Sequence, residues 1–178
     1  MHMAISTEID VWVGDVAELE VDAIIVPASE SLFMTSQSAR AVKRIAGESV
    51  ERDAVEQGPV AAGSAVVTGG GGLASGYVIH TVGVGHELRK DEQLLAAALD
   101  AALDAAARLG LTRMAAAPVG SERSVFTPDE AAEILLGVMA DRVERGAALP
   151  DSLVVAVTSA PEATAYRAAL EALGAGSR

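Results

Sequence analysis

The sequence contains no cysteine and only three histidines. Without cysteine the chain can form no disulfide, no thiolate-bound zinc or iron–sulfur cluster, and no cysteine nucleophile. His2, His80 and His86 do not form the H-E-x-x-H spacing that places two imidazoles on one helix face. We therefore expect neither a metal site nor a cofactor.

Basic residues are also scarce, with 13 Lys and Arg against 25 Asp and Glu, a formal net charge of −12. An extended footprint on the phosphate backbone of DNA or RNA needs a basic face, so we expect none. A small anionic ligand stays possible, because local backbone N–H groups can hold it.

No apolar run approaches the roughly 18 residues of a membrane helix, and no charged segment followed by an apolar one opens the chain. We therefore predict no membrane association and a cytoplasmic location. With 51% hydrophobic residues among 178, the chain should bury the core of one ordered domain. We place that domain at residues 9–173, after an N-terminal segment, 1–8, whose Met1-His2-Met3 resembles a cloning remnant, and before a tail, 174–178.

Short apolar runs alternate with segments of helical periodicity through the second half of the chain. The runs predict strands at residues 9–13, 21–26, 64–68, 77–82, 113–117 and 153–158. Helices are predicted at 37–57, interrupted at Gly47, and at 91–109, 128–144 and 161–173. Thr127-Pro128-Asp129-Glu130 has the pattern of a capping box with proline in the first turn. This order predicts an α/β sandwich with a mostly parallel sheet.

Ligands of open α/β sheets bind beyond the carboxyl ends of the strands. Four loops are candidates for that position, at residues 14–16, 27–37, 69–76 and 118–127. The four glycines at 69–72 lack the following Lys-Ser/Thr of a phosphate-binding loop and open a strand rather than a helix, which favours a flexible connector. His80 lies inside a predicted strand and is expected to be a buried structural histidine.

The sequence resembles the macro domain from about residue 9 to 172. The resemblance is carried by G-D-V at 14–16, V-D-A-I-I-V at 21–26, G-x-A-x-x-T-G at 63–69 and Y-V-I-H-T-V-G at 77–83, with Pro118 and Pro128 bracketing a later loop. It implies a three-layer α/β/α fold with a mixed six-stranded sheet and a cleft for ADP-ribose. Asp15 matches the family aspartate that accepts a hydrogen bond from the adenine amino group, and Val16 matches the neighbouring contact.

The two phosphate loops of the family are altered here. The first reads Val26-Pro27-Ala28-Ser29 and then Thr35-Ser36-Gln37-Ser38, without the family's asparagines and glycines. In the second, Arg123 and Phe126 replace two glycines. The resemblance assigns phosphate and ribose contacts to Ser29, Thr35, Ser36, Gln37, Ser38, Gly120, Ser121, Glu122, Arg123, Ser124, Val125 and Phe126.

These replacements predict a weakened phosphate site. Side chains resist the positive φ that glycine adopts, Phe126 would fill the pocket if it points inward, and Glu122 brings negative charge. Arg123 would offset this if it turns inward, because a guanidinium pairs with phosphate. The family's hydrolases use an asparagine and an aspartate, but the aligned residues are Ser29 and Ala39, so that mechanism is not expected.

Three interpretations of function follow. The first is a degenerate binder of ADP-ribose or a related adenine nucleotide, favoured by Asp15. The second is a structural or protein-interaction domain that kept the fold and lost the ligand, favoured by the lost glycines. The third is a hydrolase of ADP-ribose derivatives or a phosphoesterase with different cleft residues, such as Ser29, Thr35, Ser121 or Arg123.

Overall fold

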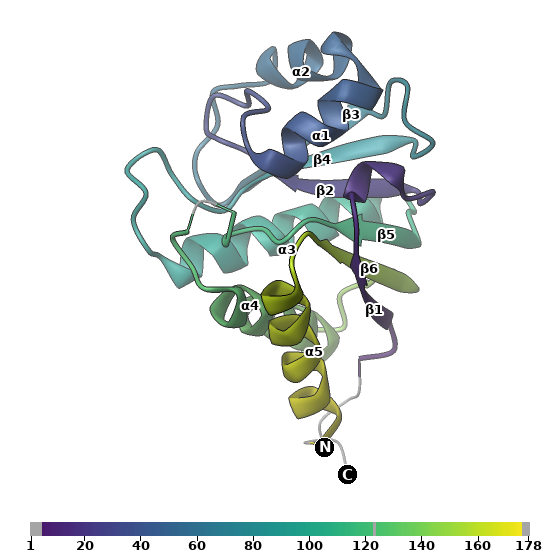
Figure 1. Ribbon diagram of the computed structural model, residues 1–178, viewed down its shortest axis with the longest axis vertical. Helices are drawn as coiled ribbons and strands as arrows, with labels where there is room; N and C mark the ends of the chain where they lie inside the picture. The colour runs from purple at the N-terminus through teal and green to yellow at the C-terminus, as the bar shows by residue number, and fades with distance from the viewer. Residues whose placement is uncertain (1–4, 123, 176–178) are drawn as a thin grey trace.

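Six strands form one sheet in the order β1-β6-β5-β2-β4-β3 (Figure 1). The computed structural model describes residues 5–122 and 124–175. The strands are β1 (Glu8–Val13), β2 (Ala23–Pro27), β3 (Ser64–Gly69), β4 (Tyr77–Val82), β5 (Arg113–Ala116) and β6 (Ser152–Val157). The first five in the spatial order run parallel, whereas β3 pairs antiparallel with β4 at one edge. The predicted mixed six-stranded sheet is confirmed.

Helices cover both faces of this sheet (Figure 1). They are the short 3-10 helix η1 (Val16–Glu18), α1 (Gln37–Ala46), α2 (Glu48–Val55), α3 (Glu92–Arg108), α4 (Pro128–Glu144) and α5 (Ala160–Ala175). One core cluster packs the sheet against α3, α4 and α5, and a second packs it against η1, α1 and α2. This is the three-layer arrangement expected from the resemblance. Within the described residues, no helix is both long and apolar enough to cross a membrane.

The apolar runs of the central strands reflect burial on both faces. Neighbouring strand residues point to opposite sides of a sheet, so Ile25 and Ile79 join the core under α3 while Ile24 and Val78 join the core under α1. All four side chains are almost completely buried. Strands enclosed in this way show continuous rather than alternating hydrophobicity.

Local signals set the ends of the helices. The predicted helical segment 37–57 divides at Gly47, whose φ of 97° ends α1 and starts α2. Thr127 and Glu130 form the reciprocal capping box of α4, with Pro128 in its first turn. η1 was not predicted, because three residues carry no helical periodicity.

The glycine-rich segment 69–76 does not lie at the carboxyl ends of the parallel strands. It joins β3 to its antiparallel partner β4, so it sits at the opposite end of the sheet, where Gly76 N donates to Asp22 O before β2. Gly71 adopts φ 56° and packs against α1, where an added Cβ would lie 2.2 Å from Ala46 O. The inclusion of this segment among the candidate ligand loops was therefore wrong, whereas it does connect two strands as expected. Its glycines allow close packing against α1.

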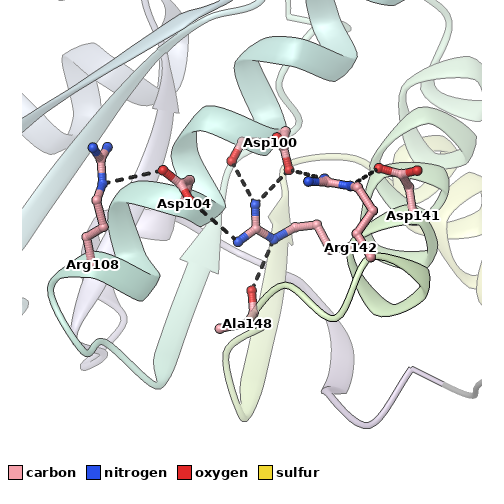
Figure 2. A network of polar contacts seen from close by, with 7 residues as sticks. Asp100, Asp104, Arg108, Asp141, Arg142 and Ala148 are labelled. Atoms are coloured by element: carbon pink, nitrogen blue, oxygen red, sulfur yellow. Dashed lines mark hydrogen bonds and ion pairs between the residues drawn. The ribbon is translucent and has the colours of Figure 1, made fainter.

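A buried arginine joins α3 to α4 (Figure 2). Arg142 is 2% exposed, and its guanidinium donates to Asp100 Oδ1 at 2.7 Å and to Ala148 O at 3.0 Å. Arg145 donates to the same Asp100 oxygen at 2.9 Å. Burial of Asp100 would raise its pKa, but hydrogen bonds from the two arginines outweigh this and hold the pKa below its ordinary value.

Candidate functional site

A cleft of about 1090 Å³ opens at the carboxyl ends of the parallel strands, on the side of α1. This is the position at which open α/β sheets bind ligands. Its walls come from the ends of β1, β5 and β6, the loop after β2, and α1. The lining residues are Gly14, Asp15, Val16, Phe33, Met34, Thr35, Gln37, Ser38, Arg40, Ala41, Lys43, Arg44, Gly47, Glu48, Glu51, Pro118, Glu122, Ala156 and Thr158.

Asp15 is fixed at the β1 end of this cleft by the turn that follows the strand. It caps η1, with Oδ1 accepting a hydrogen bond from Ala17 N at 2.9 Å. Its other oxygen, Oδ2, lies 3.7 Å from an exposed Arg44 guanidinium, a weak surface pair. One carboxylate oxygen is thus used by the fold and the second is available to a ligand donor. Val16 lines the cleft beside it.

Three basic residues of the cleft were not predicted from the sequence. Arg40, Lys43 and Arg44 all line it from α1. Their i, i+3, i+4 spacing puts them on one helix face, and this signal was available in the sequence. Lys43 donates to Glu51 at 2.8 Å and also lies 3.1 Å from Glu48, and these carboxylates hold its pKa above the ordinary value. The exposed side chain of Phe33, on the preceding loop, was missed as well.

The cleft narrows toward β2 and β4 into a small inner pocket of about 20 Å³, room for about one water molecule. It is lined by Pro27, Ala28, Ser29, Thr35, Ser36, Thr81, Gly83, Val84, Val119, Gly120 and Glu122. Next to Ser29 in the chain, Glu30 accepts hydrogen bonds from His86 Nδ1 at 2.6 Å and His86 N at 3.0 Å. These two bonds hold the pKa of Glu30 below its ordinary value.

The predicted phosphate residues separate into two groups. Ser29, Thr35, Ser36, Gln37, Ser38, Gly120 and Glu122 line the cleft or the inner pocket. Ser121, Ser124, Val125 and Phe126 line neither, and Arg123 lies outside the described residues. Phe126 is 2% exposed and packs in the core with Leu95, with Lys90 Nζ 5.8 Å from its ring centroid. Phe126 therefore does not fill the cleft.

Glu122 stands where the cleft meets the inner pocket, since it lines both. Its Oε2 is buried, and the side chains of Ser36 and Ser38 and the backbone of Ser38 lie within reach of the carboxylate. Burial raises the pKa of Glu122 above the ordinary value, although polar groups of Ser38 and Ser36 pull it down, and the nearby Glu162 adds to the rise. This end of the cleft is acidic.

Two of the hydroxyls considered as catalytic groups, those of Ser29 and Ser121, have no general base beside them in the described residues. Ser29 Oγ lies 3.0 Å from Ser31 Oγ, and Ser121 Oγ donates to the carbonyl of Pro118 at 3.2 Å. In the part of the chain that the structure describes, neither hydroxyl contacts a histidine or a carboxylate that could act as a base. His80 is fully buried in β4, where its Nε2 pairs with Thr68 Oγ1 at 2.9 Å. The prediction of a buried strand histidine is confirmed.

Comparisons with known proteins agree with this architecture. The family model of the Macro domain matches residues 25–135. An uncharacterized protein of Mycobacterium tuberculosis is 31% identical over 165 residues, which are 93% of this chain and 45% of that protein. The chain thus spans about half the length of this relative. An uncharacterized protein of Fusobacterium nucleatum is 32% identical over 126 residues, covering 69% of this chain and 72% of that protein.

Solved structures show the same fold. The Oceanobacillus iheyensis macrodomain with ADP superimposes with a TM-score of 0.84 at 21% identity, covering 99% of this chain and 97% of that one. The Trypanosoma brucei macrodomain in complex with ADP-ribose has a TM-score of 0.83 at 23% identity, covering 92% and 69%. The structural likeness extends over nearly the whole chain, so it includes the strands and loops that form the cleft.

Proposed function

This chain belongs to the macro-domain family, and from that premise we propose that its cleft binds an adenine nucleoside or nucleotide with an altered phosphate end. The adenine lies beside Asp15, and the sugar with its 5′ substituent extends toward Glu122. The ligand is ADP-ribose or a related adenine compound, held without help from the family's glycine-rich phosphate loops. The protein is a binding module and not a hydrolase of the asparagine–aspartate type.

The observation that carries this proposal is the position of Asp15. Its carboxylate is oriented by η1, lines an open cleft of about 1090 Å³, and keeps Oδ2 for a donor such as an exocyclic amino group. The opposite end of the cleft offers a ligand little space and, among its described residues, no positive charge, since the inner pocket has a volume of only about 20 Å³ and is lined by the Glu122 carboxylate. These two ends are consistent with a module that takes most of its affinity from contacts with the base and sugar and little from contacts with the phosphates.

Two observations argue against catalysis by the family's usual groups. Ser29 and Ala39 stand at the positions of the asparagine and the aspartate, and Ala39 is buried inside α1. Neither side chain can activate a water molecule as a carboxylate does. A protein-interaction domain without a small ligand remains the competing interpretation, and binding measurements decide between the two.

We predict that Asp15→Ala weakens the binding of adenosine or AMP by roughly 1–3 kcal/mol, about 5- to 150-fold, the range for a hydrogen bond to a charged acceptor. Isothermal titration calorimetry of the wild type and the variant measures this loss. Equal affinities would mean that the adenine does not contact Asp15.

Asp15→Asn is the matched control, because Asp15 also caps η1. An asparagine retains an Oδ1 that can accept from Ala17 N, but it replaces the second oxygen with an amide that donates. We expect Asp15→Asn to keep the melting temperature of the wild type and to lose affinity nearly as much as Asp15→Ala. If Asp15→Asn binds normally, the cap rather than the ligand contact accounts for the effect in Asp15→Ala.

A further inference from the structure

The most exposed aromatic side chain of the described chain lies in the cleft. Phe33 is 49% exposed and lines the cleft from the loop between β2 and α1, and it is the only aromatic among the described residues of the wall. Phe126 and Tyr166, by contrast, are buried in the core. A single exposed apolar residue is ordinary on an outer surface. In a ligand cleft, an aromatic ring is a typical contact for a flat apolar face.

The backbone of this loop holds the ring in the cleft. Leu32 has a φ of 63°, which residues other than glycine rarely adopt, and its side chain is completely buried. On the other side of Phe33, the side chain of Met34 is buried as well, and its N–H donates to Glu51 Oε2 at 2.8 Å. Both neighbours of Phe33 are thus fixed in the protein. A strained conformation that the surrounding structure holds in place is common at ligand-binding sites.

The same loop is joined to the part of α1 that lies beside Asp15. Glu51, which holds the loop, accepts a second hydrogen bond through Oε1 from Lys43 of α1 at 2.8 Å. Arg44, the next residue of the helix, lies 3.7 Å from Asp15 Oδ2. Phe33 and Asp15 therefore border the same stretch of the cleft. A carboxylate accepts hydrogen bonds along the edge of a heterocycle, whereas an aromatic ring packs on its face, so the two side chains offer complementary contacts to one base.

We propose that Phe33 stacks on the base of the adenine nucleoside whose amino group is held by Asp15. This inference rests on the proposed function, because Asp15 places the base in this part of the cleft. Stacking removes apolar surface of both rings from water and adds the interaction of two π systems. The base is recognised on its edge by Asp15 and on its face by Phe33. Phe33 is thus a specificity-determining residue for planar bases, and its contribution to affinity needs no phosphate-binding loop.

Calorimetric titrations of adenosine and AMP into the wild type and three variants of Phe33 test this assignment. In Phe33→Ala we expect both ligands to bind roughly 5- to 150-fold more weakly, the range for an aromatic side chain stacked on a base. The factor should be the same for both, because they share the base. Phe33→Leu keeps an apolar side chain without a ring and should lose most of this affinity, whereas Phe33→Tyr should bind within about twofold of the wild type.

Ile45→Ala is the matched control, because Ile45 is 46% exposed on α1 but does not line the cleft. We expect this variant to keep the wild-type affinity for both ligands. Truncation of an exposed side chain changes stability little, so the melting temperatures of Phe33→Ala and Ile45→Ala should both stay close to that of the wild type. A loss of binding in Phe33→Ala is then not a loss of fold.

The results also separate this inference from the proposed function. If the wild type binds adenosine and Phe33→Ala binds it equally well, or if Phe33→Leu matches Phe33→Tyr, the stacking contact is overturned and the adenine site at Asp15 stands. A loss for AMP alone would place Phe33 at the 5′ substituent and likewise overturn its contact with the base. If the wild type binds neither ligand, both the inference and the proposed function are overturned.

Discussion

Replacing Arg142 with methionine should lower the free energy of unfolding by about 3–5 kcal/mol, the cost of removing one partner from a buried ion pair. The guanidinium is 2% exposed and contacts groups from helix α3 and the loop after α4: Asp100, the more distant Asp104 at 3.9 Å, and the carbonyl of Ala148 (Figure 2). Methionine fills a similar space but offers no donor, so the Ala148 carbonyl and one side of Asp100 lose their partner.

Urea denaturation of the wild type and Arg142→Met measures this loss, provided that both transitions have the same m value. Arg108→Met is the matched control, because Arg108 pairs with Asp104 at 3.4 Å but is 73% exposed in its side chain. An exposed pair of this kind contributes about 0–1 kcal/mol. Equal losses in the free energy of unfolding of the two variants would show that the burial of Arg142 does not increase the stability of the contact between α3 and α4.

Acid should destabilise the protein through His80 well above the pH at which carboxylates are usually protonated. The imidazole is fully buried, its Nδ1 has no partner among the described residues, and burial lowers its pKa to about 4 from 6.5. The unfolded chain binds a proton near pH 6.5, whereas the folded protein resists protonation until about pH 4. The contribution of neutral His80 to the free energy of unfolding is therefore complete above pH 6.5 and is lost as the pH falls from 6.5 to 4.

The size of this effect follows from about 1.36 kcal/mol for each pH unit, which gives about 3 kcal/mol over the window. Denaturation curves at several pH values should show that the free energy of unfolding of the wild type falls steeply between pH 6.5 and 4. In His80→Gln, whose side chain does not titrate, the free energy of unfolding should fall by about 3 kcal/mol less over the same window. His86→Gln, in which an exposed imidazole is replaced, should keep the steep decline. A decline equally steep in His80→Gln would mean that His80 is protonated in the folded protein.

The sequence predicts most of the fold because its signals are local. Apolar runs identify all six strands, and the Thr127–Glu130 pattern places the start of α4 at Pro128 as observed. The position of segment 69–76 could not be read in the same way. Its place in the sheet depends on whether β3 runs parallel or antiparallel to β4, and that is decided by tertiary pairing.

The candidate site is predicted less completely, for a related reason. Asp15 follows a strand directly, so its place at the carboxyl edge can be inferred from the sequence alone. The direction in which a loop side chain points cannot be inferred in this way. Phe126 turns into the core formed with α3 and α4, whereas Glu122 faces the cleft. The basic face of α1 was visible in the spacing of Arg40, Lys43 and Arg44, but its direction depends on how α1 packs on the sheet.

The most direct test is the ratio of the dissociation constants of AMP and ADP-ribose, measured by calorimetry at fixed salt. If the base and sugar supply most of the affinity, ADP-ribose should bind no more than about tenfold more tightly than AMP, because the second phosphate and ribose meet the acidic end of the cleft at Glu122 and the small inner pocket. Micromolar or tighter binding of ADP-ribose with AMP roughly a hundredfold weaker would contradict this. It would mean that the altered loops still hold a diphosphate.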